Sequence, residues 1–290
     1  MRTLVAFVLA IGALAAMPPR ATAALIYGIT FDNNLFSFDS SAPTNILSGV
    51  YVSGLQPNEF IQAIDFRPST NVLYALGSTN RIYTLNLTTG AATAVGAPFS
   101  PALSGTAFGM DFDPVADRIR VVSDTDQNLR IDPTTGAVAS VDTNLAYGPG
   151  PYAGVNPSIV GAAYTNNVPG ANATTLFVVD CVLDVLAIQN PPNDGALTVV
   201  GTLGHDVINY LAGFDIESST GVAYLVAAGG GGGRSWLFTV NLATGLTVAE
   251  GVVGGGLNVR AIAIPIPEPT TLAAAGLAVM GLAVRRRGVQ

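Results

Sequence analysis

The sequence predicts an all-β protein, a five-bladed β-propeller built from four-stranded antiparallel blades. Three observations lead to this fold: a loose repeat, a Gly-containing turn at the same place in each repeat, and two incomplete end segments that complement each other. Hydrophobic residues make up 49% of the chain and charged residues only 11%, which argues against disorder and leaves ample material for a core.

Four internal segments share one pattern and predict one blade each. Each segment begins with a small residue inside a short apolar strand, at Ala63, Gly109, Gly161 or Gly213. Second and third strands follow, and a turn such as TTGAAT, TTGAVA, NDGALT or ATGLTV leads into a fourth strand. The four segments span residues 62–96, 108–142, 160–201 and 212–251.

The two ends of the domain predict the fifth blade. The segment at 25–49 reads as second, third and fourth strands without a first, whereas residues 259–264 read as a lone first strand. Ala261 falls at the position of the small residue that opens the other segments. Joining both ends in one blade closes the ring and leaves no free blade edge.

Both ends of the chain look like targeting segments, so we expect the propeller to occupy residues 24–264. Residues 1–23 combine an early Arg, an apolar run and a small-residue cleavage site, which is typical of a secretory signal peptide. Residues 265–290 contain an apolar run at 272–284 which, as a helix, would be roughly 20 Å long, a short transmembrane segment. The residues that flank this run and complete the expected sorting motif are Pro267, Glu268 and Pro269 before it and Arg285, Arg286 and Arg287 after it. The three Arg would keep their end of the segment cytoplasmic.

This tail resembles the PEP-CTERM sorting signal of Gram-negative bacteria, although an ordinary C-terminal anchor would also have an apolar run and basic residues. The resemblance implies export through the inner membrane, transient anchoring by the tail, and processing by an exosortase, a membrane transpeptidase. The product would then reside at the cell surface or outside the cell. Only the tail would contact the membrane.

The charge of the predicted domain excludes some partners. It has eighteen acidic residues against seven Arg, and the whole chain has no Lys. Binding to nucleic acid or anionic lipid is therefore disfavoured, whereas cations, sugars and basic proteins remain open as partners. The single cysteine, Cys181, lies in an apolar run and reads as a small buried hydrophobe.

Several stretches, among them IDFRPSTNVLYALG and DFDPVADRIRVVSDTDQNLRIDPTTG, are similar to the bacterial DUF4394 family. The likeness covers about residues 25–264. It implies a secreted domain and brings no activity or catalytic residues with it.

Asp65, Asp111 and Asp215 recur at the end of three first strands. The structural interpretation is that each accepts hydrogen bonds from turn N–H groups. The alternative is that they face one mouth of a central channel and hold a cation, although Ala163 and Ala263 interrupt the ring of carboxylates.

Arg118, Arg120 and Arg130 form the most distinctive polar cluster of the sequence. They lie on two adjacent predicted strands of one blade, near Asp111. They predict either a fork for a carboxylated or phosphorylated ligand, or structural ion pairs with Asp117, Asp132 or Asp111.

Two further features bear on ligands. Asp124, Asp126 and Asn128 have the spacing that begins an EF-hand, but Leu129 and Thr135 stand where that loop needs Gly and Glu, so a solvated acidic turn is the main interpretation. Three tyrosines in Gly/Pro-rich connections, Tyr147, Tyr152 and Tyr210, are candidates for a sugar-stacking surface.

We expect an exported, non-catalytic propeller that acts as a binding or matrix module at the cell surface or in exopolysaccharide. Its partners would be the exosortase, extracellular polysaccharide or surface proteins. The alternatives are a Ca²⁺-dependent hydrolase or lactonase and a purely structural scaffold. No G-x-S-x-G motif occurs, and no nucleophile is placed beside the single histidine, His205. No cofactor is expected other than Ca²⁺ in the hydrolase alternative.

Overall fold

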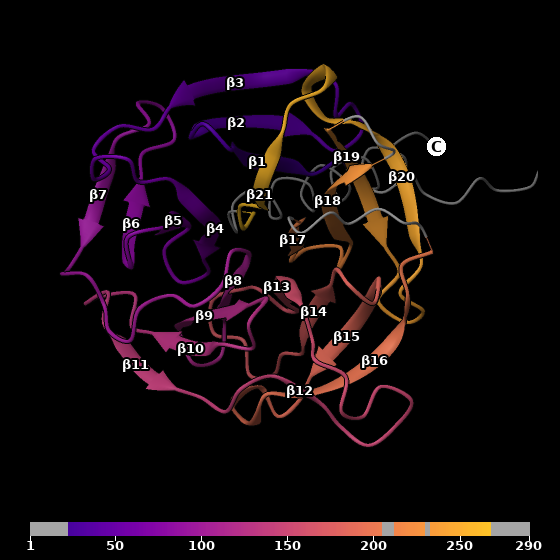
Figure 1. The fold of residues 1–290 in the computed structure, drawn as a ribbon. Coiled ribbons are helices and arrows are strands. Elements are labelled where there is room, and N and C mark those ends of the chain that lie inside the picture. Colours follow the sequence, from indigo (N-terminus) through magenta and orange to yellow (C-terminus); the bar gives the residue numbers. More distant parts are fainter. Residues whose placement is uncertain (1–22, 205–211, 230–232, 268–290) are drawn as a thin grey trace, which may run out of the picture.

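The computed structural model describes residues 23–204, 212–229 and 233–267. Over these residues the chain forms five small antiparallel sheets arranged as blades around a central axis (Figure 1). The predicted five-bladed β-propeller is confirmed. The described part contains only two short 3₁₀ turns besides the strands, Pro192–Asp194 and Val253–Gly255.

Blades 2 to 5 take their strands in chain order from the axis to the rim. Blade 2 contains β4 (Ile61–Arg67), β5 (Val72–Gly77), β6 (Arg81–Leu85) and β7 (Ala92–Val95). Blade 3 contains β8 (Phe108–Asp113), β9 (Arg118–Ser123), β10 (Asn128–Ile131) and β11 (Val138–Val141). Blade 4 contains β13 (Ile159–Tyr164), β14 (Leu176–Asp180), β15 (Val185–Gln189) and β16 (Ala196–Thr202), with β12 (Ala146–Tyr147) added in parallel along β16. Blade 5 contains β17 (Ala212–Ile216), β18 (Ala223–Gly229), β19 (Arg234–Val240) and β20 (Thr247–Val252).

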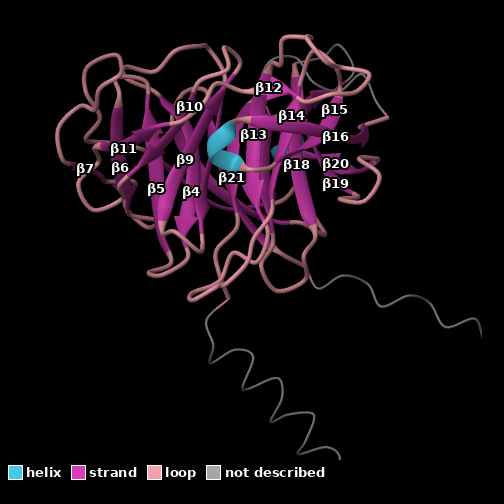
Figure 2. Cartoon of the chain, turned by 90° about the horizontal axis from the view of Figure 1, so that it is seen from below, coloured by secondary structure: helices cyan, strands magenta, loops and turns pink. Residues whose placement is uncertain are grey.

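Blade 1 closes the ring with strands from both ends of the domain. It contains β21 (Val259–Ala263) at the axis, followed by β1 (Leu25–Thr30), β2 (Asn34–Asp39) and β3 (Ile46–Tyr51). β21 pairs antiparallel with β1, and Tyr27 lies opposite Ala263. The start of β1 and the end of β21 therefore lie side by side. They belong to one of the two faces of the ring, which Figure 2 shows as loops above and below the strands.

The C-terminal segment stays attached to that face beyond the last strand. The backbone N–H of Ile266 donates to Asn71 Oδ1 at 3.0 Å, and the Asn71 amide donates to the carbonyl of Ile266 at 2.9 Å. Ile266 itself is buried in the hydrophobic cluster shared by blades 1, 2 and 3. We call these two hydrogen bonds between Asn71 and Ile266 the clamp, and the last described residue, Pro267, follows directly after it.

Burial decreases from the axis to the rim. All six residues of β13 are buried, and the first six of the seven residues of β4 are buried, because each inner strand has a neighbouring blade on both faces. The outer strand β3 is largely exposed. Continuous burial explains why the inner strands read as unbroken apolar runs, without the alternation typical of strands that face solvent on one side.

The small residues that open each repeat allow the inner strands to approach closely. A Cβ atom on Gly109 would lie 2.7 Å from backbone atoms of Gly161 and Ala162 on β13. A Cβ atom on Gly213 would lie 2.6 Å from the nitrogen of Ile262 on β21. These distances are shorter than van der Waals contact, so glycine is needed where the backbones of adjacent blades touch.

The Gly-containing turns between third and fourth strands also form as predicted. Gly90 and Gly136 both have a φ of 69°, in the left-handed region that glycine enters without steric cost. These turns send each chain segment back along the blade into its outermost strand.

Candidate functional site

Three buried carboxylates meet at the axis of the ring. Asp65, Asp111 and Asp215 lie at the same level on the inner strands of blades 2, 3 and 5, and each is about 1% exposed. One oxygen atom of each lies within 4.8 Å of the others. Blades 4 and 1 place Ala163 and Ala263 at this level. The convergence that the repeat suggested is therefore present in the structure.

Two of these carboxylates connect neighbouring inner strands. Asp65 Oδ1 accepts the N–H of the following residue, Phe66, and Oδ2 accepts the N–H of Phe112 in the next blade, both at 2.7 Å. Asp215 Oδ1 accepts the N–H of the following residue, Ile216, and Oδ2 accepts the N–H of Ile264 in blade 1, both at 2.6 Å. The N–H donors belong to the inner strands and their ends in two adjacent blades, not only to the local turn that the sequence suggested.

Asp111 differs from the other two. It accepts a backbone hydrogen bond from Tyr164 in blade 4, but its Oδ1 atom is buried without a hydrogen-bond partner in the described part of the chain. None of the ion pairs among the described residues includes any of the three carboxylates. A buried carboxylate oxygen without a hydrogen-bond donor is unusual and needs an explanation.

Burial and mutual repulsion disfavour the ionised forms of this cluster. Desolvation, together with the charge of Asp215, raises the pKa of Asp65 well above its usual range. Desolvation and the charges of Asp65 and Asp215 do the same to the pKa of Asp111. Burial raises the pKa of Asp215 to about 7. The cluster therefore favours either bound protons or a bound cation.

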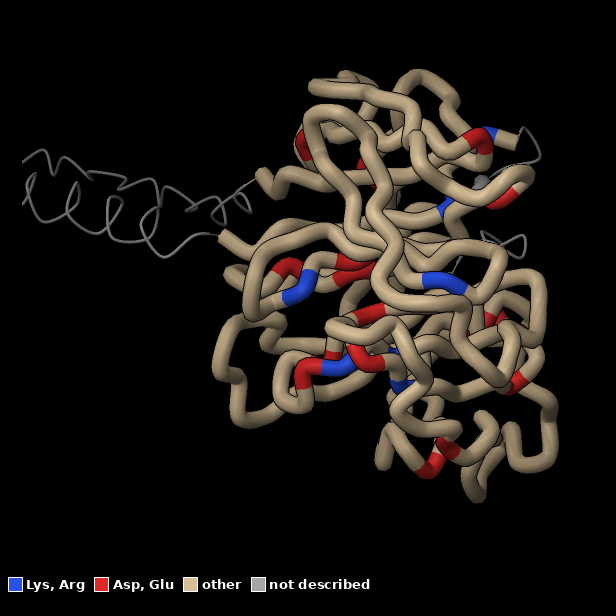
Figure 3. Tube along the Cα trace, turned by 90° about the vertical axis from the view of Figure 1, so that its left-hand side faces the viewer, with Lys and Arg blue, Asp and Glu red and all other residues tan. Residues whose placement is uncertain are grey.

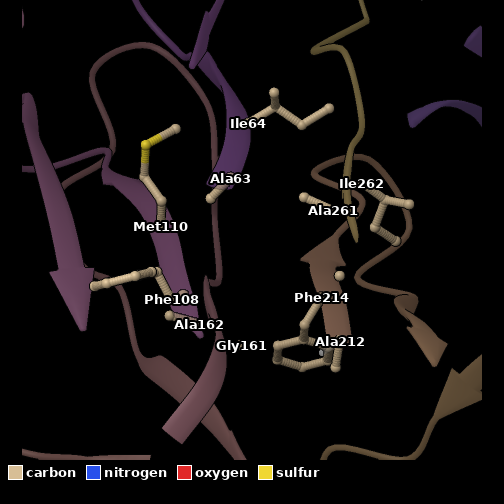
Figure 4. A pocket seen from close by; sticks show the side chains of 12 residues that line it. Ala63, Ile64, Phe108, Met110, Gly161, Ala162, Ala212, Phe214, Ala261 and Ile262 are labelled. Carbon is tan, nitrogen blue, oxygen red and sulfur yellow. The ribbon is translucent and has the colours of Figure 1, made fainter. Parts of the chain in front are cut away.

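A small cavity lies on the axis, lined by sequence neighbours of the carboxylates such as Ile64, Met110 and Phe214, but by none of the three Asp side chains. Figure 4 shows the side chains around it, which come from all five inner strands. Its volume is about 10 Å³, close to the size of a single water molecule. This cavity therefore has no room for an organic substrate.

The Arg cluster is mostly engaged with protein groups. Arg120 is 1% exposed, and its N–H groups donate to acceptors on several different segments. These acceptors are the side-chain oxygens of Tyr164 (3.3 Å), Asn128 (2.8 Å), Asp142 (2.6 Å) and Asn193 (2.7 Å). The bonds occupy all three nitrogens of the guanidinium, which carries five N–H donors in a fixed fork. This arrangement favours a structural role at the contact between blades 3 and 4.

Asp142 is the ion-pair partner of Arg120 and Arg130, which sequence analysis did not identify. Arg130 donates to both of its oxygens, at 2.8 and 2.9 Å, and Arg120 donates to Oδ2. Arg118 pairs with Asp132 at 3.4 Å, as the structural interpretation proposed. Asp117 instead forms a bidentate pair with Arg67 of blade 2. Desolvation opposes ionisation of Asp142, but hydrogen bonds from Arg130, Ser140 and Arg120 outweigh it and lower its pKa.

The EF-hand-like residues do not converge. Asp124 accepts the backbone N–H and hydroxyl of Thr106, at 2.9 and 2.7 Å. The Asn128 side chain points into the Arg120 network, where it also donates to the carbonyls of Thr143 and Pro192. These contacts favour the interpretation of this segment as a structural turn.

A cavity of about 230 Å³ lies on the rim of blade 4. It is lined by the connection from Tyr147 to Tyr152 and by Leu197, Thr198 and Val199 of β16. The two tyrosine rings lie with their centroids 5.7 Å apart. The hydroxyl of Tyr147 donates to Asp180 Oδ2 at 2.7 Å, which fixes that ring. Tyr210, the third tyrosine of the predicted sugar-stacking surface, lies outside the described residues, as does His205.

A cation–π arrangement near the start of β21, at the end of the axis away from the C-terminal segment, was not predicted. The Arg260 guanidinium lies 4.2 Å from the ring centroid of Phe31 and 4.7 Å from that of Phe60. It also donates to Gln62 Oε1 at 3.0 Å, and burial lowers its pKa. Arg260 thereby links the closing strand β21 to the β1–β2 turn and to blade 2. Only the arrangement of the two ends in one blade brings these residues together.

Basic residues are few along the described chain. In Figure 3 the Arg positions are few and scattered among more numerous Asp and Glu positions. This distribution agrees with the acidic balance of the sequence. Cys181 is half-buried, with its sulfur 3.3 Å from Ser158 Oγ, and is thus more accessible than predicted.

The comparisons with known proteins agree with this architecture. A model of the family DUF4394, described as a domain of unknown function, matches residues 34–263. The chain belongs to the DUF4394 family. The PEP-CTERM protein-sorting motif matches residues 265–287 of this DUF4394 protein. The motif supports export, processing by an exosortase, and sorting to the cell envelope of a Gram-negative bacterium.

The matched motif contains every residue that the sequence assigned to the sorting signal. The matched residues are Pro267, Glu268 and Pro269 at its start and Arg285, Arg286 and Arg287 at its end. Of these six, Pro267 alone belongs to the part of the chain that the structure describes, and the other five lie outside it. The family match thus supports their assignment to the signal, whereas the cytoplasmic position expected for Arg285, Arg286 and Arg287 stays a prediction.

One of two solved structures compared with the chain shows likeness at the level of the fold. A structural genomics protein of unknown function from Bacteroides thetaiotaomicron has a TM-score of 0.50 and 13% identity, over 70% of this chain. The alignment covers 53% of that protein, so this DUF4394 chain corresponds to about half of it. Glutaminyl cyclase from Myxococcus xanthus has a TM-score of 0.46 and 11% identity, over 80% of this chain and 97% of that one. No curated protein matches the chain.

The membrane-spanning helix predicted at 272–284 lies outside the described residues, as does the signal peptide up to residue 22. Within the described ranges, no helix has the length and apolar character that crossing a bilayer requires.

Proposed function

We propose that this DUF4394 domain is a non-catalytic binding module of the cell surface or exopolysaccharide, and that it binds a neutral sugar unit in the cavity on the rim of blade 4. The observation that carries the proposal is the lining of this cavity. The half-buried Tyr152 supplies an aromatic ring beside the buried Tyr147 within a Gly/Pro-rich connection, and none of the lining residues is charged.

The chemistry of the cavity suits a sugar ring. Aromatic side chains bind apolar faces with their rings, while their hydroxyls and the nearby backbone bind polar groups. A volume of about 230 Å³ is below the range typical of drug-sized ligands, so a single ring of a longer chain is the expected occupant. The hydrogen bond from Tyr147 to Asp180 holds one ring before any ligand arrives, which lowers the entropic cost of binding.

The position of the cavity suits a sorted protein. The described ends of the chain lie on one face of the ring, next to the axis, whereas the cavity lies on the rim. A tail attached to that face would therefore leave the cavity accessible to an extended polysaccharide.

A binding measurement with one variant and one matched control tests the proposal. We expect the exported wild-type protein to co-sediment with exopolysaccharide from the producing strain, and Tyr152→Ala to weaken binding by about tenfold or more, the equivalent of about 1.4 kcal/mol. The control is Tyr51→Ala, because Tyr51 is 66% exposed on the outer strand β3, far from the cavity. Equal binding by both variants would contradict the proposal. No binding by the wild type would favour the scaffold alternative.

The geometry gives less support to a Ca²⁺-dependent hydrolase or lactonase. A catalytic metal needs an open position for substrate or water. Asp65, Asp111 and Asp215 are each about 1% exposed, so the described structure gives a substrate no direct access to their carboxylates. This enclosure argues for a structural role of the carboxylates.

A further inference from the structure

We infer that Asp65, Asp111 and Asp215 form a structural Ca²⁺ site on the axis of the propeller, which ties together the inner strands of blades 2, 3 and 5. This site goes beyond the proposed sugar-binding function and does not depend on it.

The first argument is the uncompensated charge. The three carboxylates are buried at one place and have no ion-pair partner among the described residues. Two of them receive two backbone N–H bonds each, but these dipoles offset only part of three negative charges. A divalent cation would offset two of the three negative charges that the fully ionised cluster carries.

The second argument is the orphaned oxygen atom. Asp111 is 1% exposed, and its Oδ1 has no hydrogen-bond partner in the described residues. Asp65 and Asp215 also keep acceptor capacity, because each carboxylate offers about four lone-pair sites and only two are used. The cluster can therefore offer at least three oxygen ligands without breaking any of these hydrogen bonds.

The third argument is the spacing. Because no two of the three oxygen atoms are more than 4.8 Å apart, a point exists within about 2.8 Å of all three. Ca²⁺ binds oxygen at about 2.3–2.6 Å and takes six to eight oxygen ligands in flexible geometry, so a contraction of a few tenths of an ångström would bring these three oxygens into coordination. The second carboxylate oxygens or water would supply the remaining ligands. Mg²⁺ requires about 2.0–2.1 Å and octahedral geometry, which would need a larger movement of three packed inner strands.

Two sequence positions make a clean variant available. Blades 4 and 1 carry Ala163 and Ala263 at the level of the three carboxylates, so Asp111→Ala introduces a residue that this ring already accommodates there. Asp111→Asn is a second variant that keeps the side-chain shape and removes the charge. Asp124→Asn is the matched control, because it removes a carboxylate from the EF-hand-like turn of the same blade.

The experiment compares thermal unfolding of the exported chain, purified with its tail, in EGTA and in Ca²⁺. We expect the wild-type Tm to rise by roughly 5–10 °C at 100 times the dissociation constant. Asp111→Ala should lose this rise, because it removes one of the three ligands. Its Tm in EGTA will reflect both the repulsion that it relieves and the hydrogen bond from the Tyr164 N–H that it removes. Asp124→Asn should respond to Ca²⁺ as the wild type does, and Mg²⁺ should give a smaller shift.

Calorimetric titration with Ca²⁺ gives the second measurement, with one ion expected per wild-type chain and at least a tenfold loss of affinity in Asp111→Asn. A wild type whose Tm ignores Ca²⁺ would overturn the inference. So would equal destabilisation of Asp111→Ala in EGTA and in Ca²⁺, which is the result expected if Asp111 only accepts a hydrogen bond. Loss of the Ca²⁺ response in Asp124→Asn alone would place the ion in the turn instead.

Discussion

Replacing Asp142 by Ala should destabilise the propeller strongly, because it leaves Arg120 buried without a counter-ion. Arg120 is 1% exposed and lies 2.6 Å from Asp142 Oδ2, whereas Arg130 is 30% exposed and can turn toward solvent. Removing one partner of a buried ion pair costs about 3–5 kcal/mol. Since Asn128, Asn193 and Tyr164 still accept hydrogen bonds from Arg120, we expect about 3 kcal/mol, the lower end of that range.

The assay is urea unfolding of the exported protein, supported by thermal unfolding. For a domain of this size the loss corresponds to a Tm decrease of about 6–12 °C. Arg118→Met is the control, because the Arg118–Asp132 pair is 3.4 Å long and its side chains are 37% and 24% exposed, so its removal should cost at most about 1 kcal/mol. The double variant Asp142→Ala/Arg120→Met should recover part of the stability, since no unpaired charge remains buried. If the free energies of unfolding of Asp142→Ala and Arg118→Met differ by less than about 1 kcal/mol, the buried network does not stabilise the contact between blades 3 and 4.

Three further predictions follow from the same contacts. The pKa of Asp142 is lowered in the folded protein, so the stability that its ionised form contributes is fully present above the unfolded pKa of about 3.9. That stability is lost as the pH falls through the lower pKa of the folded state. The difference in unfolding free energy between wild type and Asp142→Asn, measured by urea unfolding, should therefore shrink below about pH 4. Gly213→Ala should lower the free energy of unfolding by about 1–3 kcal/mol, because its Cβ would lie 2.6 Å from the backbone of β21. The control Gly148→Ala, whose Cβ would lie 3.7 Å from the nearest atom, should unfold like the wild type. Similar urea midpoints for both variants would mean that the inner strands separate easily. Truncation after residue 258 removes β21 and should abolish the single cooperative unfolding transition, and an unchanged calorimetric transition would show that ring closure contributes little.

The fold could be predicted because the four internal blades contain the same local signals. A small residue in the first strand and a glycine in the last turn recur in every internal segment, and both have a local steric cause that a single sequence displays. The closing blade was also predictable, because the strands missing at one end were present at the other.

The partners of the charged residues were less predictable. Asp142 lies 22 residues from Arg120 in sequence, and Asn193 lies 73 residues away. These groups meet because the outer strand of blade 3 abuts the turn before the outer strand of blade 4, where the N–H of Thr143 donates to the carbonyl of Asn193. The Arg260 contact with Phe31 and Phe60 has the same origin. A repeat indicates which residues share a level in the ring, but not which side chains meet across two blades.

The clamp between Asn71 and Ile266 has a mechanical consequence for a protein held by its C-terminal tail. Tension on the tail would enter the domain at Ile266 and run along β21, the innermost strand of blade 1. Because β21 is pulled along its own axis against its antiparallel neighbour β1, the hydrogen bonds between them would be loaded together in shear instead of opening one after another. The lifetime of the attached domain under fluid drag would then depend on the unfolding rate of this one strand pair.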